Sequence, residues 1–372
     1  MRSFLVCWIG LWWCAAPAAA ERRVTAGLES ALELDTNPRR AEGSESSIDQ
    51  AKTLTRVAGR LEVAESDVAG GALIGVGSAQ VRAGLEEGTS SESLALLSLD
   101  SQWLREVRDG EVRIGPRISF RDAEPLAEDA EDRAYRSASA DLSGVLLGPD
   151  ARVMVSAGPR VFQYPDNDAS SWRGGGAAVR GDFSLWSGGD ADEQSLELVA
   201  LAAVEQRAYY ARAYTNGCAP GQRVTEACFL VTPRRRGDRM HQASARLIYT
   251  GTIVASLEYQ ITVVDSNSFG RSWIGQRTRA ALTAPVGPAF LTGIATAQLD
   301  QYPDGLLVAR DPSNGLFDTL EDDNRSSLEA RLAIPLGRSS VSLEGRLATW
   351  RELSGDVTYG RSLASLGLVW VK

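Results

Sequence analysis

Few side chains in this sequence could carry acid–base or metal chemistry. There is a single histidine, His241, whereas histidine is the commonest metal ligand and the commonest acid–base group in catalysis. The nearest downstream serine, Ser244, lies three residues further on, which places the two side chains on opposite faces of a strand. No Gly-x-Ser-x-Gly turn, phosphate-binding loop or Cys-x-x-Cys pair is present. These observations predict a protein that is not an enzyme, with no cofactor and no metal site.

Two cysteines are expected to form a disulfide. Residues 1–20 have the composition of a secretory signal, because Met1-Arg2 precedes an apolar run that ends in small residues. We predict cleavage after Ala20, which leaves residues 21–372 as a single domain. Cys218 and Cys228 are then the cysteines that remain in an exported chain, and such an even pair indicates a disulfide.

The charge of the chain argues against nucleic acid as a partner. The formal net charge is −9 at pH 7, and Lys52 and Lys372 are the only lysines. Nucleic-acid binding depends on dense positive charge. We therefore expect no nucleic-acid partner.

The elements that position these residues show a hydrophobic period of two. Between Val24 and Asp35, apolar residues such as Leu28 and Leu32 alternate with acidic ones, which is the pattern of a strand with one apolar and one polar face. The pattern recurs about 16 times. The runs start near residues 24, 52, 71, 93, 111, 135, 151, 174, 195, 240, 252, 273, 289, 325, 340 and 359.

These runs are long enough to cross a membrane as strands. Each covers about 11–15 residues, and a tilted transmembrane strand needs roughly 9–11. Their polar faces carry arginine together with glutamate, charges that are prohibitive in a dry core and ordinary in a wet lumen. Long and short gaps alternate between the runs. We predict an all-β fold, a single closed antiparallel transmembrane β-barrel in the outer membrane, with about 16 strands (roughly 14–18), long extracellular loops and short periplasmic turns.

One face of each strand is expected to point into the lumen. The lumen-facing candidates are Arg56, Arg60, Arg113, Arg117, Arg121, Arg160, Arg180, Arg246, Arg277, Arg331, Arg346, Glu29, Glu33, Glu197, Glu258, Glu329, Glu344, Trp186 and Trp350. The charges either brace the wall as cross-strand ion pairs or line a hydrated passage, since such a barrel is too wide for side chains to fill. The aromatic side chains either contact sugar rings or pack at a rim.

Two long loops stand out by their charge. The first is expected at residues 209–239 and is basic, with Arg234-Arg235-Arg236 beside the cysteine pair. It either folds into the lumen as a constriction, stands outside as a lid, or contacts lipid phosphates. The second contains Asp318, Glu321, Asp322 and Asp323, which are either solvated or bind divalent cations shared with lipopolysaccharide.

The closing segment, from Ser362 to Lys372, alternates up to the aromatic Trp370. With the signal and the repeated strands, it resembles bacterial outer-membrane β-barrels, although in that family the aromatic residue is terminal and here two residues follow it. The segments Leu34–Pro38 and Val264–Ser268 are similar to strand–loop junctions of barrels linked to polysaccharide export. The resemblance implies as partners outer-membrane lipid and lipopolysaccharide and the barrel-assembly machinery, and, if the barrel exports a polymer, a periplasmic polysaccharide-export protein.

Two classes of function fit these expectations. The first is a channel for polar solutes, most specifically for the export of a secreted polysaccharide, with a general diffusion porin as its alternative. The second is a plugged structural or adhesive barrel that acts through its extracellular loops.

Overall fold

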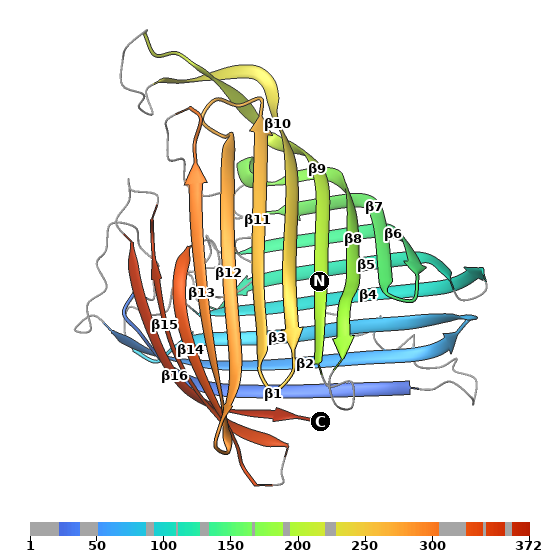
Figure 1. The fold of residues 1–372 in the computed structure, drawn as a ribbon. Helices are drawn as coiled ribbons and strands as arrows, with labels where there is room; N and C mark the ends of the chain where they lie inside the picture. Colours follow the sequence, from blue (N-terminus) through green and yellow to red (C-terminus); the bar gives the residue numbers. More distant parts are fainter. Residues whose placement is uncertain are drawn as a thin grey trace.

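The chain forms a closed β-barrel (Figure 1). In the computed structural model, sixteen strands pair with their neighbours in sequence order, and β16 pairs with β1 to close the wall. All the pairings are antiparallel, so the predicted barrel of about 16 strands is confirmed. The structure describes residues 22–37, 51–86, 93–108, 111–126, 134–165, 168–188, 194–219, 228–304, 325–337, 340–353 and 359–372.

The strands have the lengths expected of membrane-crossing strands. They are β1 (Arg22–Asp35), β2 (Lys52–Val68), β3 (Gly71–Gly84), β4 (Leu94–Arg108), β5 (Val112–Pro125), β6 (Tyr135–Leu147), β7 (Ala151–Gln163), β8 (Trp172–Gly188), β9 (Gln194–Asn216), β10 (Phe229–Thr250), β11 (Val254–Ser266), β12 (Trp273–Val286), β13 (Ala289–Gln301), β14 (Ser326–Pro335), β15 (Val341–Arg351) and β16 (Gly360–Val371). Among the described residues, no helix is long and apolar enough to span a membrane.

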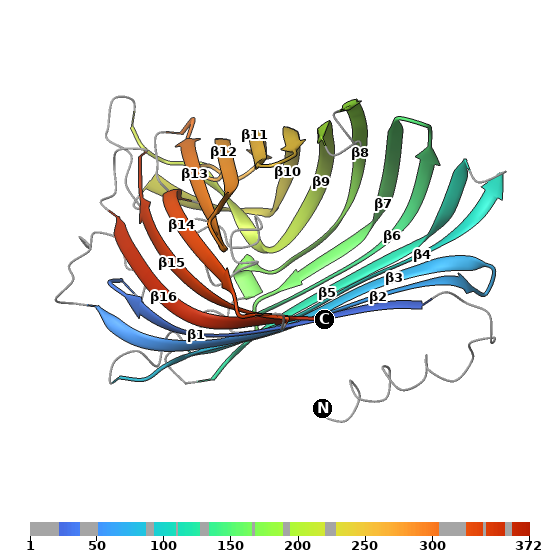
Figure 2. The same cartoon turned by 60° about the horizontal axis from the view of Figure 1, so that its bottom comes forward.

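The strands are strongly tilted. Figure 1 shows β9–β13 running steeply across the view, while β1–β4 run nearly at right angles to them. In Figure 2 the wall turns back on itself from β8 round to β16 and β1. Barrel strands tilt by about 35–45° from the axis, so strands on opposite walls cross at a wide angle.

The predicted alternation is present in the barrel wall. On β1, Leu28 and Leu32 are exposed on the outer surface, whereas Glu33 and Asp35 are buried on the inner face. Cross-strand partners share a face, so the pairing of Leu32 with Leu366 carries the apolar surface across the β1–β16 closure. The barrel therefore has an apolar exterior and a polar interior.

The start of β1 and the end of β16 lie side by side at one end of the barrel. The backbone N–H groups of Ala26 and Lys372 each donate to the carbonyl of the other, at 2.9 Å. At this end the chain turns within residues 69–70, 251–253 and 287–288. Residues 38–50 and the acidic cluster at 318–323 lie outside the described residues.

The prediction of a long loop over residues 209–239 is wrong. Strand β9 continues to Asn216, and β10 begins at Phe229. The alternation persists, because Tyr209 and Ala213 are buried while Arg212 between them is exposed. Register shifts between Val231 and Gly237 accommodate the proline and the arginines of this stretch. The basic segment is therefore largely a paired hairpin.

Two glycines allow close contact between neighbouring strands. A Cβ atom added at Gly115 of β5 would lie 1.8 Å from the carbonyl oxygen of Trp103 on β4. A Cβ atom added at Gly174 of β8 would lie 1.8 Å from the carbonyl oxygen of Gln206 on β9. Any side chain at these positions would force the two backbones apart.

Candidate functional site: the inner face of the barrel

The register defines which side chains belong to the inner face, because cross-strand partners lie on the same side of the sheet. It places the following predicted lumen-facing residues there: Arg56, Arg60, Arg113, Arg117, Arg121, Arg160, Arg180, Arg246, Arg277, Arg331, Arg346, Glu29, Glu33, Glu197, Glu258, Glu329, Glu344 and Trp350.

Trp186 is the exception, and its predicted inward position is wrong. A register shift between Ser184 and Trp186 inserts one extra residue, Leu185, into β8. Trp186 consequently pairs with Leu196. Leu196 shares the outer face with the exposed Val204, because the two positions are separated by an even number of residues on β9. A β-bulge reverses the parity of every residue beyond it, so counting by two gave the wrong face.

A buried ionic network closes the barrel at β1 and β16. The Arg361 side chain donates to both carboxylate oxygens of Asp35, at 2.6–3.1 Å, and neither side chain is exposed. Arg82 of β3 donates to Asp35 at 2.6 Å and to Glu33 at 2.8 Å. Arg56 of β2 lies 3.0 Å from Glu33. We call these five side chains the closure network; their opposite charges and hydrogen bonds allow them to be buried.

A second ionic group lies next to the closure network along the wall. The Arg346 guanidinium donates to Glu329 at 2.8 Å, and Arg331 forms a further ion pair with the same carboxylate. Two guanidinium groups contact the ring of Trp350, that of Arg361 at 4.7 Å and that of Arg346 at 5.7 Å. Such cation–π contacts hold the arginine side chains against the wall.

A polar recess lies on the opposite part of the inner face, over β4–β10. Its volume is about 330 Å³. Within it, Arg160 donates to Glu205 at 2.7 Å, Glu205 also pairs with Arg207, and Arg117 binds Asp100 with contacts of 2.8–3.2 Å. We call this the arginine recess. It is lined by Asp100, Arg117, Ser119, Arg121, Ser137, Ala138, Ser139, Asp141, Arg160, Val161, Phe162, Trp172, Glu205, Arg207, Met240 and Gln242.

An aromatic cluster borders the arginine recess. Phe162 stacks between Tyr135, at a centroid distance of 5.3 Å, and Trp172, at 6.1 Å, while Tyr164 packs at 5.1 Å. The guanidinium of Arg207 covers Trp172 at 4.8 Å. These rings are buried, so their faces are occupied by one another. The Trp172 indole N–H is buried without a partner among the described residues.

Other inner-face charges remain open to solvent. The side chains of Arg60, Arg331 and Arg117 are 64%, 46% and 36% exposed, although all three lie inside a closed barrel. Each forms an ion pair with a carboxylate on the same face. The described residues therefore leave water-accessible space along the interior.

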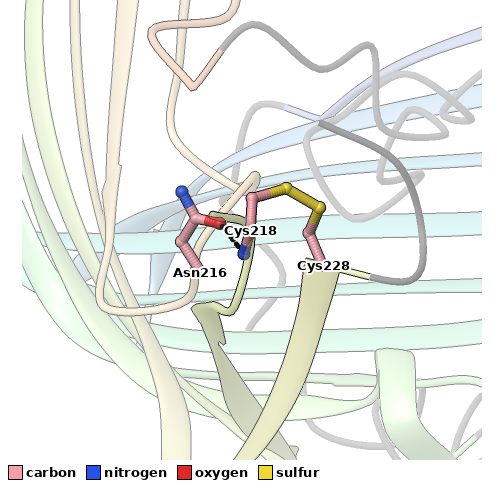
Figure 3. Close-up of a disulfide and its surroundings, with 3 residues drawn as sticks. All are labelled: Asn216, Cys218 and Cys228. Atoms are coloured by element: carbon pink, nitrogen blue, oxygen red, sulfur yellow. Dashed lines mark hydrogen bonds between the residues drawn. A yellow bond between two sulfur atoms is a disulfide. The ribbon is translucent and has the colours of Figure 1, made fainter. Parts of the chain in front are cut away.

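The disulfide lies at the tip of the β9–β10 hairpin (Figure 3). Cys218 and Cys228 are bonded, as the sequence predicts. The Cys218 N–H donates to the side-chain oxygen of Asn216 at 2.9 Å, and the Gly217 N–H donates to the Cys228 carbonyl at 2.7 Å. The bond closes the hairpin where the strand pairing ends.

Some inner-face residues were missed by counting along the sequence. Trp172 and Tyr209 fall just outside the predicted runs, although each continues the parity of its strand. Arg236 and Asp238 were assigned to a loop, whereas they form a buried ion pair on β10, with Arg236 also 3.8 Å over the ring of Tyr209. Extending the alternation through 209–239 would have found them.

The residues considered for catalysis do not come together. His241 pairs with the outward Val204, whereas Ser244 pairs with Gln260 on the inner face, so the predicted opposite orientation is confirmed. Within the described ranges, no group of three or more histidine, cysteine, aspartate or glutamate side chains is arranged to hold a metal ion.

Neither a protein-family model nor a curated protein matches the sequence. Among solved structures, OmpT, an outer membrane protein of Vibrio cholerae, is similar with a TM-score of 0.45 at 9% identity, over 95% of this chain and 100% of that one. OccK5 of Pseudomonas aeruginosa has a TM-score of 0.43 at 10% identity, over 94% and 97%. A bacterial polysaccharide outer membrane secretin has a TM-score of 0.41 at 7% identity, over 93% and 97%.

The physical properties of the wall establish where the protein resides. A closed barrel satisfies all backbone hydrogen bonds of its wall without leaving a sheet edge, and the outer face presents a band of exposed leucine and valine side chains. Such a surface requires lipid around it. The chain is an integral outer-membrane β-barrel.

Proposed function

We propose that this barrel is a passive channel for small polar solutes across the outer membrane. The observation that carries the proposal is that charged side chains inside the closed wall, such as Arg60 and Arg331, remain solvent-exposed. A sixteen-strand barrel encloses more space than side chains can fill. Water and small polar solutes therefore have a path lined with hydrogen-bond partners, and the protein needs no catalytic machinery.

The charges of the inner face favour weak selectivity. Arg117 is paired with Asp100, Arg160 with Glu205, and Arg346 with Glu329. Because positive and negative groups alternate over short distances, the described part of the wall presents no ring of a single sign, which is the feature that makes strongly selective filters. We expect cations and anions to pass at comparable rates.

Conductance of single proteins in planar lipid bilayers tests the channel. We expect steady ohmic steps, and a reversal potential near zero in a salt gradient. The variant Arg117→Glu should shift the reversal potential towards the value of a cation-selective channel, because it replaces a paired cation of the arginine recess by an anion beside Asp100. A folded protein that inserts without conductance would support instead a plugged barrel that acts through its extracellular loops.

The finer proposal is that the solute is a secreted polysaccharide. Two observations support it: the arginine recess offers ionic and hydrogen-bond partners to sugar hydroxyl and carboxylate groups, and the recess is lined by Trp172, whose buried indole N–H has no partner among the described residues. The aromatic cluster itself gives no support, because its ring faces are buried. A polymer would have to be delivered to the barrel by a separate periplasmic partner.

Two experiments separate the finer proposal from a general porin. Oligosaccharides should block the current at concentrations where polyethylene glycol of equal size does not, and Arg160→Gln should weaken the block. Deletion of the gene should reduce surface polysaccharide. Equal block by both polymers, together with normal surface polysaccharide, would leave the general porin as the function.

We also propose that the barrel-assembly machinery recognises β16 (Gly360–Val371), where Trp370 shares the outer face with Leu368 and Leu366. Replacement of Trp370 by alanine should slow insertion in cells without preventing refolding of the purified chain in detergent.

A further inference from the structure

Four arginines form a patch on the outer surface of β8–β10. They are Arg173 of β8, Arg212 of β9, and Arg235 and Arg239 of β10, and all four are exposed. Arg212 is the cross-strand partner of Arg235. Arg173 of β8 pairs with Ala208 of β9, and Ala208 pairs on its other side with Gly237 of β10. Gly237 lies between Arg235 and Arg239 in the sequence, so Arg173 is at the same level of the wall as these two arginines. We call these four residues the outer arginine patch.

The patch lies on the face that contacts lipid. Arg239 pairs with Gln206, and Ala208 and Gln206 alternate with inner-face residues in the same way as the exposed Val204. Beyond the patch, the outer surface of β10 and β11 is apolar, with Leu247 and Leu257 exposed. The arginines therefore border the apolar band of the barrel and do not belong to the lumen.

These arginines lack the counter-charges found elsewhere in the wall. None of the four forms an ion pair within the described ranges; Arg239 donates to Gln206 at 3.4 Å and has Asp265 as its cross-strand neighbour. By contrast, Arg136, on the outer surface of β6, binds Asp122 at 3.0 Å and Glu124 at 2.6 Å. Like charges directly opposite each other, as in Arg212 and Arg235, destabilise a sheet. An external anion would remove this repulsion.

The position of the patch along the barrel axis identifies the source of the anion. Outer-membrane barrels keep short turns in the periplasm, so the end opposite the termini faces outside. Thr250 is the last residue of β10 and lies at the end with the termini, and Arg239 precedes it by about 11 residues. This separation is about 28 Å along the barrel axis, at roughly 3.3 Å per residue and about 40° of tilt. The apolar band of such barrels is about 25 Å tall. The patch is therefore at the level of the outer-leaflet headgroups.

We propose that the outer arginine patch binds the phosphate groups of lipopolysaccharide in the outer leaflet. Arginine is suited to this role because its planar guanidinium forms two parallel hydrogen bonds to a phosphate. Several clustered arginines can hold the separate phosphates of one headgroup, while the acyl chains lie against the apolar surface that begins near Val204. The inference concerns only the outer surface and is independent of whether the lumen conducts.

The test measures binding of the purified, folded full chain in detergent to lipopolysaccharide, to the same lipopolysaccharide after enzymatic removal of its phosphates, and to phosphatidylglycerol micelles. The quadruple variant Arg173→Gln, Arg212→Gln, Arg235→Gln and Arg239→Gln should weaken binding of intact lipopolysaccharide about 1,000-fold, at about 1 kcal/mol for each surface arginine. The smaller variant Arg212→Gln with Arg235→Gln should weaken it about 30-fold, and it removes only a repulsive pair, so it should fold.

Arg105→Gln is the matched control, because Arg105 is exposed on the outer face of β4 near the end with the termini, and its replacement should leave binding unchanged. Dephosphorylated lipopolysaccharide should bind the unmodified protein as weakly as intact lipopolysaccharide binds the quadruple variant. Equal binding by the protein and the quadruple variant, or by intact and dephosphorylated lipopolysaccharide, would overturn the proposal. Equal binding of phosphatidylglycerol would overturn the assignment to lipopolysaccharide.

Discussion

Replacement of Arg361 by methionine should destabilise the barrel far more than replacement of an exposed arginine. Arg361 and Asp35 are both fully buried, and their contacts join the last strand to the first across 326 residues of sequence. Methionine matches much of the volume of arginine but leaves Asp35 with only Arg82 as a cationic partner. The replacement therefore removes one of the two guanidinium partners of the buried Asp35 carboxylate, where the barrel closes.

The size of the effect follows from the burial. Breaking a buried ion pair by removing one partner costs about 3–5 kcal/mol, because the remaining charge stays desolvated with less compensation, which here comes from Arg82 alone. Arg180 and Asp182 provide the comparison, since their side chains are 48% and 30% exposed, and such pairs contribute about 0–1 kcal/mol. The double variant Arg361→Met with Asp35→Leu should recover most of the loss, because Arg82 retains Glu33 at 2.8 Å.

Urea-induced unfolding in phospholipid vesicles, followed by tryptophan fluorescence, measures these differences in the free energy of unfolding. Arg361→Met should lose about 3–5 kcal/mol, Arg180→Met at most about 1 kcal/mol, and the double variant should lie between them. If Arg361→Met and Arg180→Met lose the same free energy, the closure network is solvated and the reasoning about its burial is wrong.

Three further predictions concern the hairpin, the bulge and a close strand contact. Replacement of Cys218 and Cys228 by serine should lower the stability of the hairpin tip by about 3 kcal/mol at most, because the bond closes a short loop. Proteolysis at the tip should accelerate, while the urea midpoint of barrel unfolding stays unchanged. A large shift of that midpoint would contradict a local role for the disulfide. Brominated lipid should quench the fluorescence of Trp186 and spare that of Trp350, as measured in two variants in which each is the only tryptophan of residues 21–372; the reverse order would refute the assigned bulge. Gly174→Ala should destabilise the barrel in urea unfolding by about 1–3 kcal/mol, because its Cβ would overlap the backbone of β9, and an unchanged midpoint would show that the strands can separate there.

The architecture could be predicted from the sequence because one simple rule governs it. Residues that face lipid and residues that face the interior alternate on every strand, so a run such as Val24–Asp35 reveals both faces at once. The same count predicted the inner-face positions of Arg56, Glu29 and Glu329, which the register shows together with their partners.

The rule failed where the backbone departs from a regular strand. A single extra residue at Leu185 moved Trp186 to the outer face, and bulges have no strong sequence signal. Pro233 and the adjacent arginines suggested a loop, although the stretch is paired. Arg361 could be assigned to a face, but its partner Asp35 is 326 residues away, and no local pattern identifies such a pair. Distant pairing required the three-dimensional register.

The most direct test of a barrel with a wet interior and a lipid-covered exterior uses two neighbouring residues of β9. Ala203 is on the inner face and Val204 on the outer face, and the disulfide leaves no other free thiol in residues 21–372. Ala203→Cys should react with a charged, membrane-impermeant thiol reagent and lose current in planar bilayers, whereas Val204→Cys should neither react nor lose current. Equal reaction at both positions, or reaction at Val204→Cys alone, would contradict the account.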